Sequence, residues 1–159
     1  MKVLVTGGAG YIGSHTVLCL LQSNHQVIVY DNLCNASEES LTRVQKLTGK
    51  QLEFVEGDIR DMPKLDAVFD NHKIDAVIHF AALKAVGESA QIPLSYYQNN
   101  VHGSVCLLEV MQKHQVHNFI FSSSATVYGE ENDIPYVETM KLGTPSSAYG
   151  ASKVMVERI

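Results

Sequence analysis

The sequence predicts an α/β domain built on a doubly wound parallel sheet, and two observations lead to this prediction. Short runs rich in β-branched residues alternate along the chain with longer segments whose apolar residues recur at helical spacing. The strand-like runs are almost continuously apolar, as expected when helices cover both faces of a sheet. Five strands are expected, at residues 2–6, 26–31, 52–56, 76–80 and 118–122.

Helices are expected between these strands, and the right-handed crossover rule then leaves few topologies. Helical spacing covers residues 11–22, 38–47, 62–71 and 94–114, and a last helix is expected after Ser146 or Ser147. Residues 130–144 contain Pro135 and Gly143 and are expected to form an excursion beyond the sheet edge. No internal repeat, low-complexity tract or linker is found.

The composition, 45% hydrophobic and 18% charged over 159 residues, suits one soluble globular domain. The net charge is −5 with scattered Lys and Arg, which argues against a nucleic-acid partner and favours a small-molecule ligand. Neither a signal peptide nor a membrane span is recognisable, so a cytoplasmic protein is expected. Cys19, Cys34 and Cys106 form no CxxC motif and are expected to be reduced, partly buried thiols.

A glycine-rich turn follows the first strand and opens the first helix. It contains Gly7, Gly8, Gly10 and Gly13 in the spacings GxGxxG and GxxGxxG. Glycine lets the backbone turn sharply and approach a pyrophosphate, whose charge is met by free N–H groups at the helix N-terminus. A tight β-to-α turn would also explain the glycines, but the context favours a dinucleotide site of the Rossmann type.

Asp31 lies at the end of the second predicted strand, where a carboxylate can bind both hydroxyls of the adenosine ribose. It would repel a 2'-phosphate, and residues 32–42 contain no Arg or Lys to attract one. NAD is therefore favoured over NADP. The alternative is an acid that only caps its own loop.

Tyr149 and Lys153 are four positions apart and therefore share one face of the last helix. A phenol has a pKa of about 10, and an ammonium about 5 Å away stabilises its phenolate by roughly 3 kcal/mol at an effective dielectric constant of about 20. YxxxK alone also fits a surface pair on an amphipathic helix. The cluster Ser122 to Ser124 after the fifth strand favours a site, with Ser124 expected to bind a substrate oxygen and Ser122 and Ser123 to make loop hydrogen bonds.

With these motifs in this order, the chain resembles the extended short-chain dehydrogenase/reductase superfamily and, within it, the UDP-glucose (UDP-galactose) 4-epimerase family. The likeness runs along the whole chain, through VLVTGGAGYIGSHT, YDNLCNAS, FVEGDIRD, VIHFAALKAVGES, PLSYYQNNVHGS, NFIFSSSATVYGE and TPSSAYGASKVMVE. No single piece is decisive, but the combination is highly specific.

The resemblance implies an isomerase of galactose metabolism that epimerises UDP-hexoses at C4 without consuming NAD. Tyr149 would remove the proton of the sugar 4'-hydroxyl while the 4'-hydride passes to NAD, and the 4-keto sugar would then turn over and take the hydride back. Lys153 would stabilise the phenolate and hold the nicotinamide ribose, and Ser124 would bind the 4'-oxygen. A UDP-sugar substrate and a homodimer in the full-length form are implied as well.

The resemblance also implies a set of cofactor contacts. They are the glycine turn (Gly7, Gly10, Gly13) with Tyr11 and Ile12 at the pyrophosphate, Asp31, Asn32 and Asn35 at the adenosine ribose, Asp58 and Ile59 at the adenine, Phe80, Ala81 and Ala82 along the cofactor, and Lys84 and Asn99 beside it. Without the resemblance, Asp58 would be interpreted as a turn acid and Lys84 as a solvated side chain. No histidine is assigned to catalysis and no metal is expected, because His114 and His117 fit solvated positions at a helix end without nearby carboxylates.

Two alternatives are a closely related enzyme and a protein of another class. An NDP-sugar 4,6-dehydratase needs an Asp-Glu pair just after Ser124, where this chain has Ala125 and Thr126. A regulatory NAD-binding module would have no use for Ser124, Tyr149 and Lys153 together. We also expect residues 1–159 to be an incomplete NAD-binding domain that lacks the C-terminal nucleotide-sugar domain of the resembled family, and to be inactive when made alone.

Overall fold

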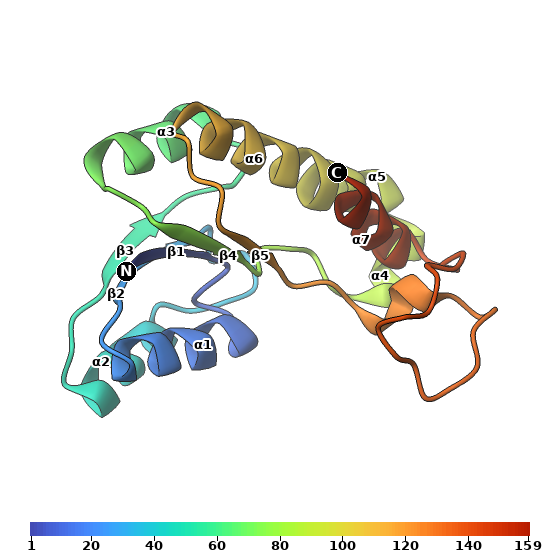
Figure 1. The fold of residues 1–159 in the computed structure, drawn as a ribbon, viewed down its shortest axis with the longest axis horizontal. Coiled ribbons are helices and arrows are strands. Elements are labelled where there is room, and N and C mark those ends of the chain that lie inside the picture. The colour runs from blue at the N-terminus through green and yellow to red at the C-terminus, as the bar shows by residue number, and fades with distance from the viewer. The chain divides into compact units, whose positions relative to one another are not determined.

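A computed structural model describes residues 1–159 and contains one five-stranded parallel sheet in the order β3-β2-β1-β4-β5 (Figure 1). The strands are β1 (Lys2–Thr6), β2 (Gln26–Asp31), β3 (Glu53–Glu56), β4 (Ala76–His79) and β5 (Phe119–Phe121). This confirms the predicted doubly wound parallel sheet. The strand order reverses beside β1, between β2 and β4, which makes the carboxyl ends of β1 and β4 the place where such sheets bind ligands.

Two hydrophobic cores cover the two faces of the sheet. Side chains alternate along a strand, so Val3 and Val5 of β1 enter one core while Leu4 enters the other. Helices α1 (Tyr11–Gln22) and α2 (Glu39–Thr48) pack on the first face, and α3 (Met62–Asn71) and α6 (Gly103–Lys113) on the second (Figure 1). The central strands β1, β2 and β4 are buried on both faces and are almost entirely apolar, whereas the short edge strands β3 and β5 are partly exposed.

The chain divides into two compact units. The first comprises Met1–Ala81 with Cys106–Ser122 and contains the whole sheet. The second comprises Ala82–Val105 with Ser123–Ile159. Its helical elements are α4 (Val86–Gln91), α5 (Pro93–Tyr96), the π-helical segment η1 (Tyr97–His102), the start of α6, the 3₁₀ turn η2 (Ala125–Tyr128) and α7 (Ala148–Arg158).

The helix predicted over residues 94–114 is in fact three successive segments, α5, η1 and α6, and α4 was not predicted. A π-helical turn inserts an extra residue into the helical repeat, so a search for a 3.6-residue period does not detect it. In η1 it brings two neighbouring residues, Asn99 and Asn100, into buried positions. The six residues of α4 are too few to show a period at all.

Residues 130–144 contain no helix or strand. The amide of Asn132 donates to the carbonyls of Tyr128 and Lys141, at 2.6 and 3.0 Å, and so ties the loop to itself. All three cysteines are free thiols, but Cys19 and Cys34 are exposed, so the prediction that they are partly buried was wrong for these two. None of the helices combines the length and the apolar character that crossing a membrane would require.

Candidate active site

The turn after β1 packs tightly against the end of β4. Gly7 has a φ of +69°, and a Cβ on it would lie 2.5 Å from the backbone nitrogen of Ala81. A Cβ on Gly13 would run into the carbonyl oxygen of Gly7. Glycine is therefore required at both positions by the fold itself, and the predicted contact residues Phe80 and Ala81 lie directly beside the turn.

Gly10 is different, because a Cβ there would approach only one atom, the carbonyl oxygen of Gly7, at 3.3 Å. Gly10 is the N-cap of α1, without a side-chain cap and without an acid in the first turn. The side chains of Tyr11 and Ile12 are exposed. The first N–H groups of α1 are thus available to an anion, and the absence of a side chain at Gly10 fits the close approach of a diphosphate.

Asp31 lies at the carboxyl end of β2 and is only 7% exposed. Its Oδ2 accepts a hydrogen bond from the Ala9 nitrogen at 3.0 Å, and its Oδ1 accepts one from the Leu33 nitrogen, also at 3.0 Å. Asp31 does therefore cap its loop, as the alternative interpretation proposed. Each carboxylate oxygen can accept a further hydrogen bond, so this capping leaves room for the predicted ribose contact.

Asp58 follows β3 and is paired with Arg60, a residue that the sequence analysis missed. Arg60 donates from Nε to Oδ1 at 2.8 Å and from Nη2 to Oδ2 at 2.6 Å, and Asn32 donates to Oδ2 at 3.0 Å. The hydrogen bonds from Arg60 hold the pKa of the Asp58 carboxyl well below its usual range. The side chain of Ile59 is buried in the core, so only its backbone remains for an adenine, and Asn35 is exposed.

The second unit contains the tyrosine and lysine pair. Helix α7 begins at Ser147, whose hydroxyl accepts from the Gly150 nitrogen at 3.1 Å, as predicted for a cap at Ser146 or Ser147. The Lys153 ammonium lies 5.9 Å from the centroid of the Tyr149 ring. Lys153 is 4% exposed, and this burial lowers its pKa to about 8. A solvated surface pair is therefore excluded.

Tyr149 is supported by a second tyrosine. The ring of Tyr96 meets it edge to face, with centroids 6.5 Å apart and an interplanar angle of 85°. Tyr96 is fully buried, and its hydroxyl lies 2.8 Å from the Ala85 carbonyl and 2.6 Å from a Glu88 carboxylate oxygen. Burial raises the pKa of Tyr96 to about 12, so this phenol stays protonated and only packs against Tyr149. Tyr149 is therefore the phenol that can ionise beside the lysine.

The serines after β5 have different roles. Ser124 is the N-cap of η2, and its Oγ accepts from the Thr126 nitrogen at 3.2 Å and from the Thr126 hydroxyl at 2.9 Å. Neither bond uses the proton of Ser124, which remains available to a substrate oxygen. Ser123 donates to the Glu157 carboxylate, which confirms a loop hydrogen bond there.

Asn100 is another residue that the sequence analysis missed. Its Oδ1 accepts from the Leu83 nitrogen at 2.8 Å and from Asn99 at 3.0 Å, and its Nδ2 donates to the Leu83 carbonyl at 2.9 Å and to Ser152 Oγ at 3.0 Å. Ser152 in turn donates to the Tyr149 carbonyl at 2.6 Å. All four hydrogen-bonding positions of the Asn100 amide are used, and they connect α7 to the segment that contains Ala82 and the exposed Lys84.

The interpretation of His114 as a solvated residue without nearby carboxylates was wrong. Its Nε2 lies 2.8 Å from Asp66 Oδ1, its side chain is 17% exposed, and Lys113 binds the same carboxylate. The three side chains join α6 to α3, and the hydrogen bonds from Lys113 and His114 hold the pKa of Asp66 below its usual range. His79 is buried as predicted, with its Nδ1 2.6 Å from the Thr6 hydroxyl. No group of three or more potential metal ligands occurs.

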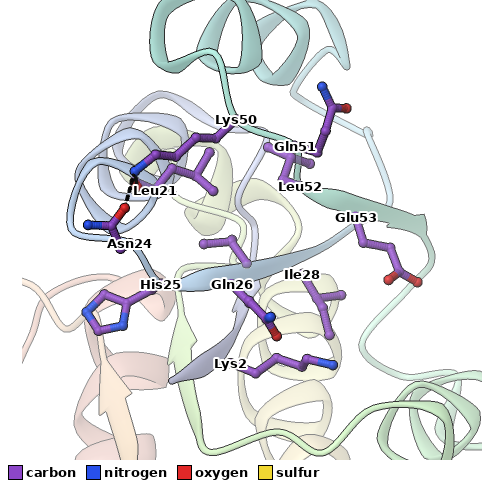
Figure 2. A pocket seen from close by; sticks show the side chains of 11 residues that line it. Lys2, Leu21, Asn24, His25, Gln26, Ile28, Lys50, Gln51, Leu52 and Glu53 are labelled. Atoms are coloured by element: carbon purple, nitrogen blue, oxygen red, sulfur yellow. Dashed lines mark hydrogen bonds between the residues drawn. The ribbon is translucent and has the colours of Figure 1, made fainter.

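A hollow of roughly 460 Å³ lies in the first unit, at the amino ends of the strands (Figure 2). Its lining includes Lys2, Gln26 and Glu53, which begin or precede their strands, and none of the predicted site residues. The Lys50 ammonium at its rim binds the Leu21 carbonyl and the Asn24 side chain, at 2.5 and 2.7 Å. Lys50 thus satisfies the end of α1, and the hollow is distinct from the predicted site.

The fold and these two groups of side chains define a Rossmann-type α/β domain with a glycine turn and a tyrosine-lysine pair. The chain belongs to the NAD dependent epimerase/dehydratase family, whose model matches residues 3–159. It is 61% identical over 159 residues to UDP-glucose 4-epimerase of Erwinia amylovora, a match that covers 100% of this chain and 47% of that enzyme. The chain therefore spans about half the length of the curated relatives it matches.

Solved structures support the same family and show the same partial coverage. UDP-glucose 4-epimerase from Bifidobacterium longum, in complex with NAD+ and UDP, matches with a TM-score of 0.98 at 47% identity, over 99% of this chain and 47% of that chain. The enzyme from Stenotrophomonas maltophila, with bound NAD and formylated UDP-arabinopyranose, matches with a TM-score of 0.95 at 49% identity, over the same two shares. The whole of this α/β domain thus corresponds to part of each of these enzymes.

Glycine substitutions distinguish the two roles of the turn. Gly13→Ala is expected to destabilise the protein by about 1–3 kcal/mol, because its methyl group meets backbone atoms that cannot move away. Gly10→Ala is expected to change stability by less than about 1 kcal/mol but to weaken dinucleotide binding about tenfold or more. Thermal unfolding and ligand titration measure the two effects, and equal losses of stability in both variants would contradict the distinction.

The buried charge of Lys153 predicts a pH dependence of stability. Its pKa is about 8 in the folded protein against the usual 10.5 of a lysine, so between these values the unfolded state binds more protons and stability rises with pH. Burial of the charged lysine lowers the stability of the folded protein by about 3 kcal/mol below pH 8, and the Lys153→Met variant lacks this effect. Melting temperatures of parent and variant from pH 7.5 to 10 test this, with exposed Lys46→Met as a control. A constant difference between parent and Lys153→Met would contradict it.

Proposed function

We propose that the protein interconverts UDP-glucose and UDP-galactose by NAD-dependent epimerisation at C4 of the hexose. The observation that carries this proposal is the buried Lys153 ammonium, 5.9 Å from the Tyr149 ring centroid, in a chain of this family. A relative 61% identical to it is a UDP-glucose 4-epimerase. The activity would make the protein an isomerase of galactose metabolism.

NAD is the proposed cofactor, and two similar solved structures hold it. We propose that its diphosphate binds the uncapped N-terminus of α1, where Gly10 gives space. The further proposed contacts are those predicted from the sequence, namely Gly7, Tyr11, Ile12, Gly13, Asp31, Asn32, Asn35, Asp58, Ile59, Phe80, Ala81, Ala82, Lys84, Asn99, Tyr149 and Lys153. When bound, NAD accepts a hydride from the sugar C4 and later returns it.

The side chains of α7 and η2 would manage the proton. Tyr149, as a phenolate, removes the proton of the 4'-hydroxyl and returns it when the 4-keto sugar is reduced on its other face. The Lys153 ammonium lies 5.9 Å from the centroid of that ring. A cation about 5 Å from a phenolate oxygen stabilises it by roughly 3 kcal/mol at an effective dielectric constant of about 20. The free proton of Ser124 is donated to the 4'-oxygen, which bears negative charge during the reaction. Proton and hydride both return to the sugar, so the reaction is balanced.

The same turn argues against a dehydratase. Elimination of water needs an acid and a base beside the sugar, and the residues after Ser124 are Ala125 and Thr126. The hydroxyl of Thr126 donates to Ser124 Oγ at 2.9 Å, so Thr126 serves to orient the serine. An epimerase needs no further acid or base, because one tyrosine removes and returns the same proton.

We also propose that residues 1–159 supply the cofactor site and the proton-transfer residues, and that the UDP-sugar pocket is completed by residues corresponding to the other half of the relatives' length. A cytoplasmic location is proposed because all three cysteines are free thiols. The proposed homodimer of the full-length form rests on the resemblance to the family.

The function is tested by Tyr149→Phe in a chain of the relatives' full length. This variant keeps the ring and its contact with Tyr96 but has no proton to exchange, so turnover of UDP-galactose is expected to fall by about 10²-fold or more. NAD binding is expected to remain. Tyr136→Phe, in the loop before α7, is the matched control. Turnover of Tyr149→Phe within twofold of the parent would overturn the assignment.

Asp31→Ala tests the adenosine site. The substitution removes a ribose acceptor and a source of repulsion for a 2'-phosphate, so NAD affinity is expected to fall far more than NADP affinity. The two dissociation constants are measured on the same protein preparation. Because Asp31 also holds the Ala9 and Leu33 nitrogens, part of the loss will be common to both cofactors, and equal losses would contradict the assignment.

A further inference from the structure

A cation lies next to the proposed adenosine site, although the sequence near Asp31 contains none. The guanidinium of Arg60 binds both oxygens of Asp58, at 2.8 and 2.6 Å, and the second oxygen accepts from the Asn32 amide at 3.0 Å. Arg60 is thus connected through one carboxylate to the residue that follows Asp31. Its side chain is 43% exposed, so burial does not hide its charge. The ion pair with Asp58 neutralises that charge instead.

The pairing of β2 with β3 explains this arrangement. The two strands are parallel, with Asp31 opposite Glu56, so the loops that follow them lie side by side at the carboxyl edge of the sheet. The Asn32 side chain continues the network, because its Oδ1 accepts from the Cys34 nitrogen at 3.1 Å. Arg60, Asp58 and Asn32 therefore order the loop that follows the proposed ribose acceptor, Asp31.

The bidentate geometry leaves Arg60 with capacity for another anion. A guanidinium has five N–H donors, and the two side-chain bonds to Asp58 use two of them. A 2'-phosphate in the adenosine site would attract this cation, since arginine is well suited to bind phosphate oxygens. Asp58 competes for the same guanidinium at a fixed short distance, and its own charge repels a phosphate.

We propose that the Asp58–Arg60 pair is a determinant of cofactor choice, in which Asp58 withholds Arg60 from a 2'-phosphate and so favours NAD over NADP. This inference rests on the proposed function, because it assumes that the adenosine of a dinucleotide lies beside Asp31. It assigns Asp58 a second role in addition to its proposed contact with adenine. Arg60 is the residue whose charge decides the outcome.

The test is a mutant cycle in the full-length protein, freed of bound dinucleotide. Dissociation constants for NAD and for NADP are measured by calorimetric titration for the parent, Asp58→Asn, Arg60→Gln and the double variant. The ratio of the NADP constant to the NAD constant is compared, because loss of an adenine contact affects both cofactors equally and cancels.

The ratio is expected to fall about tenfold in Asp58→Asn, because the asparagine keeps the shape and releases the cation. It is expected to return close to the parent value in the Asp58→Asn/Arg60→Gln double variant. Asp66→Asn is the matched control, since it makes the same charge change and releases Lys113 elsewhere in the same unit. Its ratio is expected to stay at the parent value.

An unchanged ratio in Asp58→Asn overturns the inference, and so does a fall that persists in the double variant, since repulsion by Asp58 alone would then explain it. Arg60→Gln, at an exposed position, gives an independent reading. It leaves Asp58 uncompensated, so the ratio is expected to rise about threefold, and an unchanged or lower ratio overturns the inference. A parent protein that binds neither cofactor would instead overturn the proposed function.

Discussion

The first unit depends on the close packing of the turn after β1 against the end of β4. Gly7 adopts a left-handed conformation and lies so near Ala81 that any side chain would collide with that backbone. Its nitrogen donates to the Tyr30 carbonyl at 2.9 Å, which joins the turn to β2 as well. The turn therefore leads directly into α1 at the point where the strand order reverses, and its position fixes where the free N–H groups of the helix lie.

Much of this organisation could be predicted from the sequence because its causes are local. The central strands β1, β2 and β4 are buried on both faces and are therefore mostly apolar, the glycines lie close together in the sequence, and the Ser147 cap bonds three residues ahead. Tyr149 and Lys153 share a face because they are four positions apart. The burial of Lys153 is not revealed by a helical pattern and comes only from the structure.

The features that were missed depend on contacts between distant parts of the chain. Arg60 is linked to Asn32 through Asp58 only because β3 pairs with β2, and the local sequence after Asp31 contains no sign of it. Asn100 became buried through a π-helical turn that no simple period describes. His114 meets Asp66 across 48 positions, so its partner was invisible in the local sequence. Strand order and register, once known, would have revealed the first of these.

The two groups of charged residues follow opposite electrostatic strategies. Around Asp58 the charges are partly exposed and paired, so their fields largely cancel, which suits the proposed site for an uncharged ribose edge. At Lys153 an ammonium is buried and its pKa falls to about 8, which means that the fold retains a charge that burial disfavours. Such a cost fits the proposed function, in which the charge stabilises a phenolate that forms only during the reaction, because an anion beside Lys153 relieves the same cost. Lys153 should therefore lower the stability of the folded protein while it favours catalysis. The Asp58–Arg60 pair should change the preference for NAD over NADP more than it changes stability.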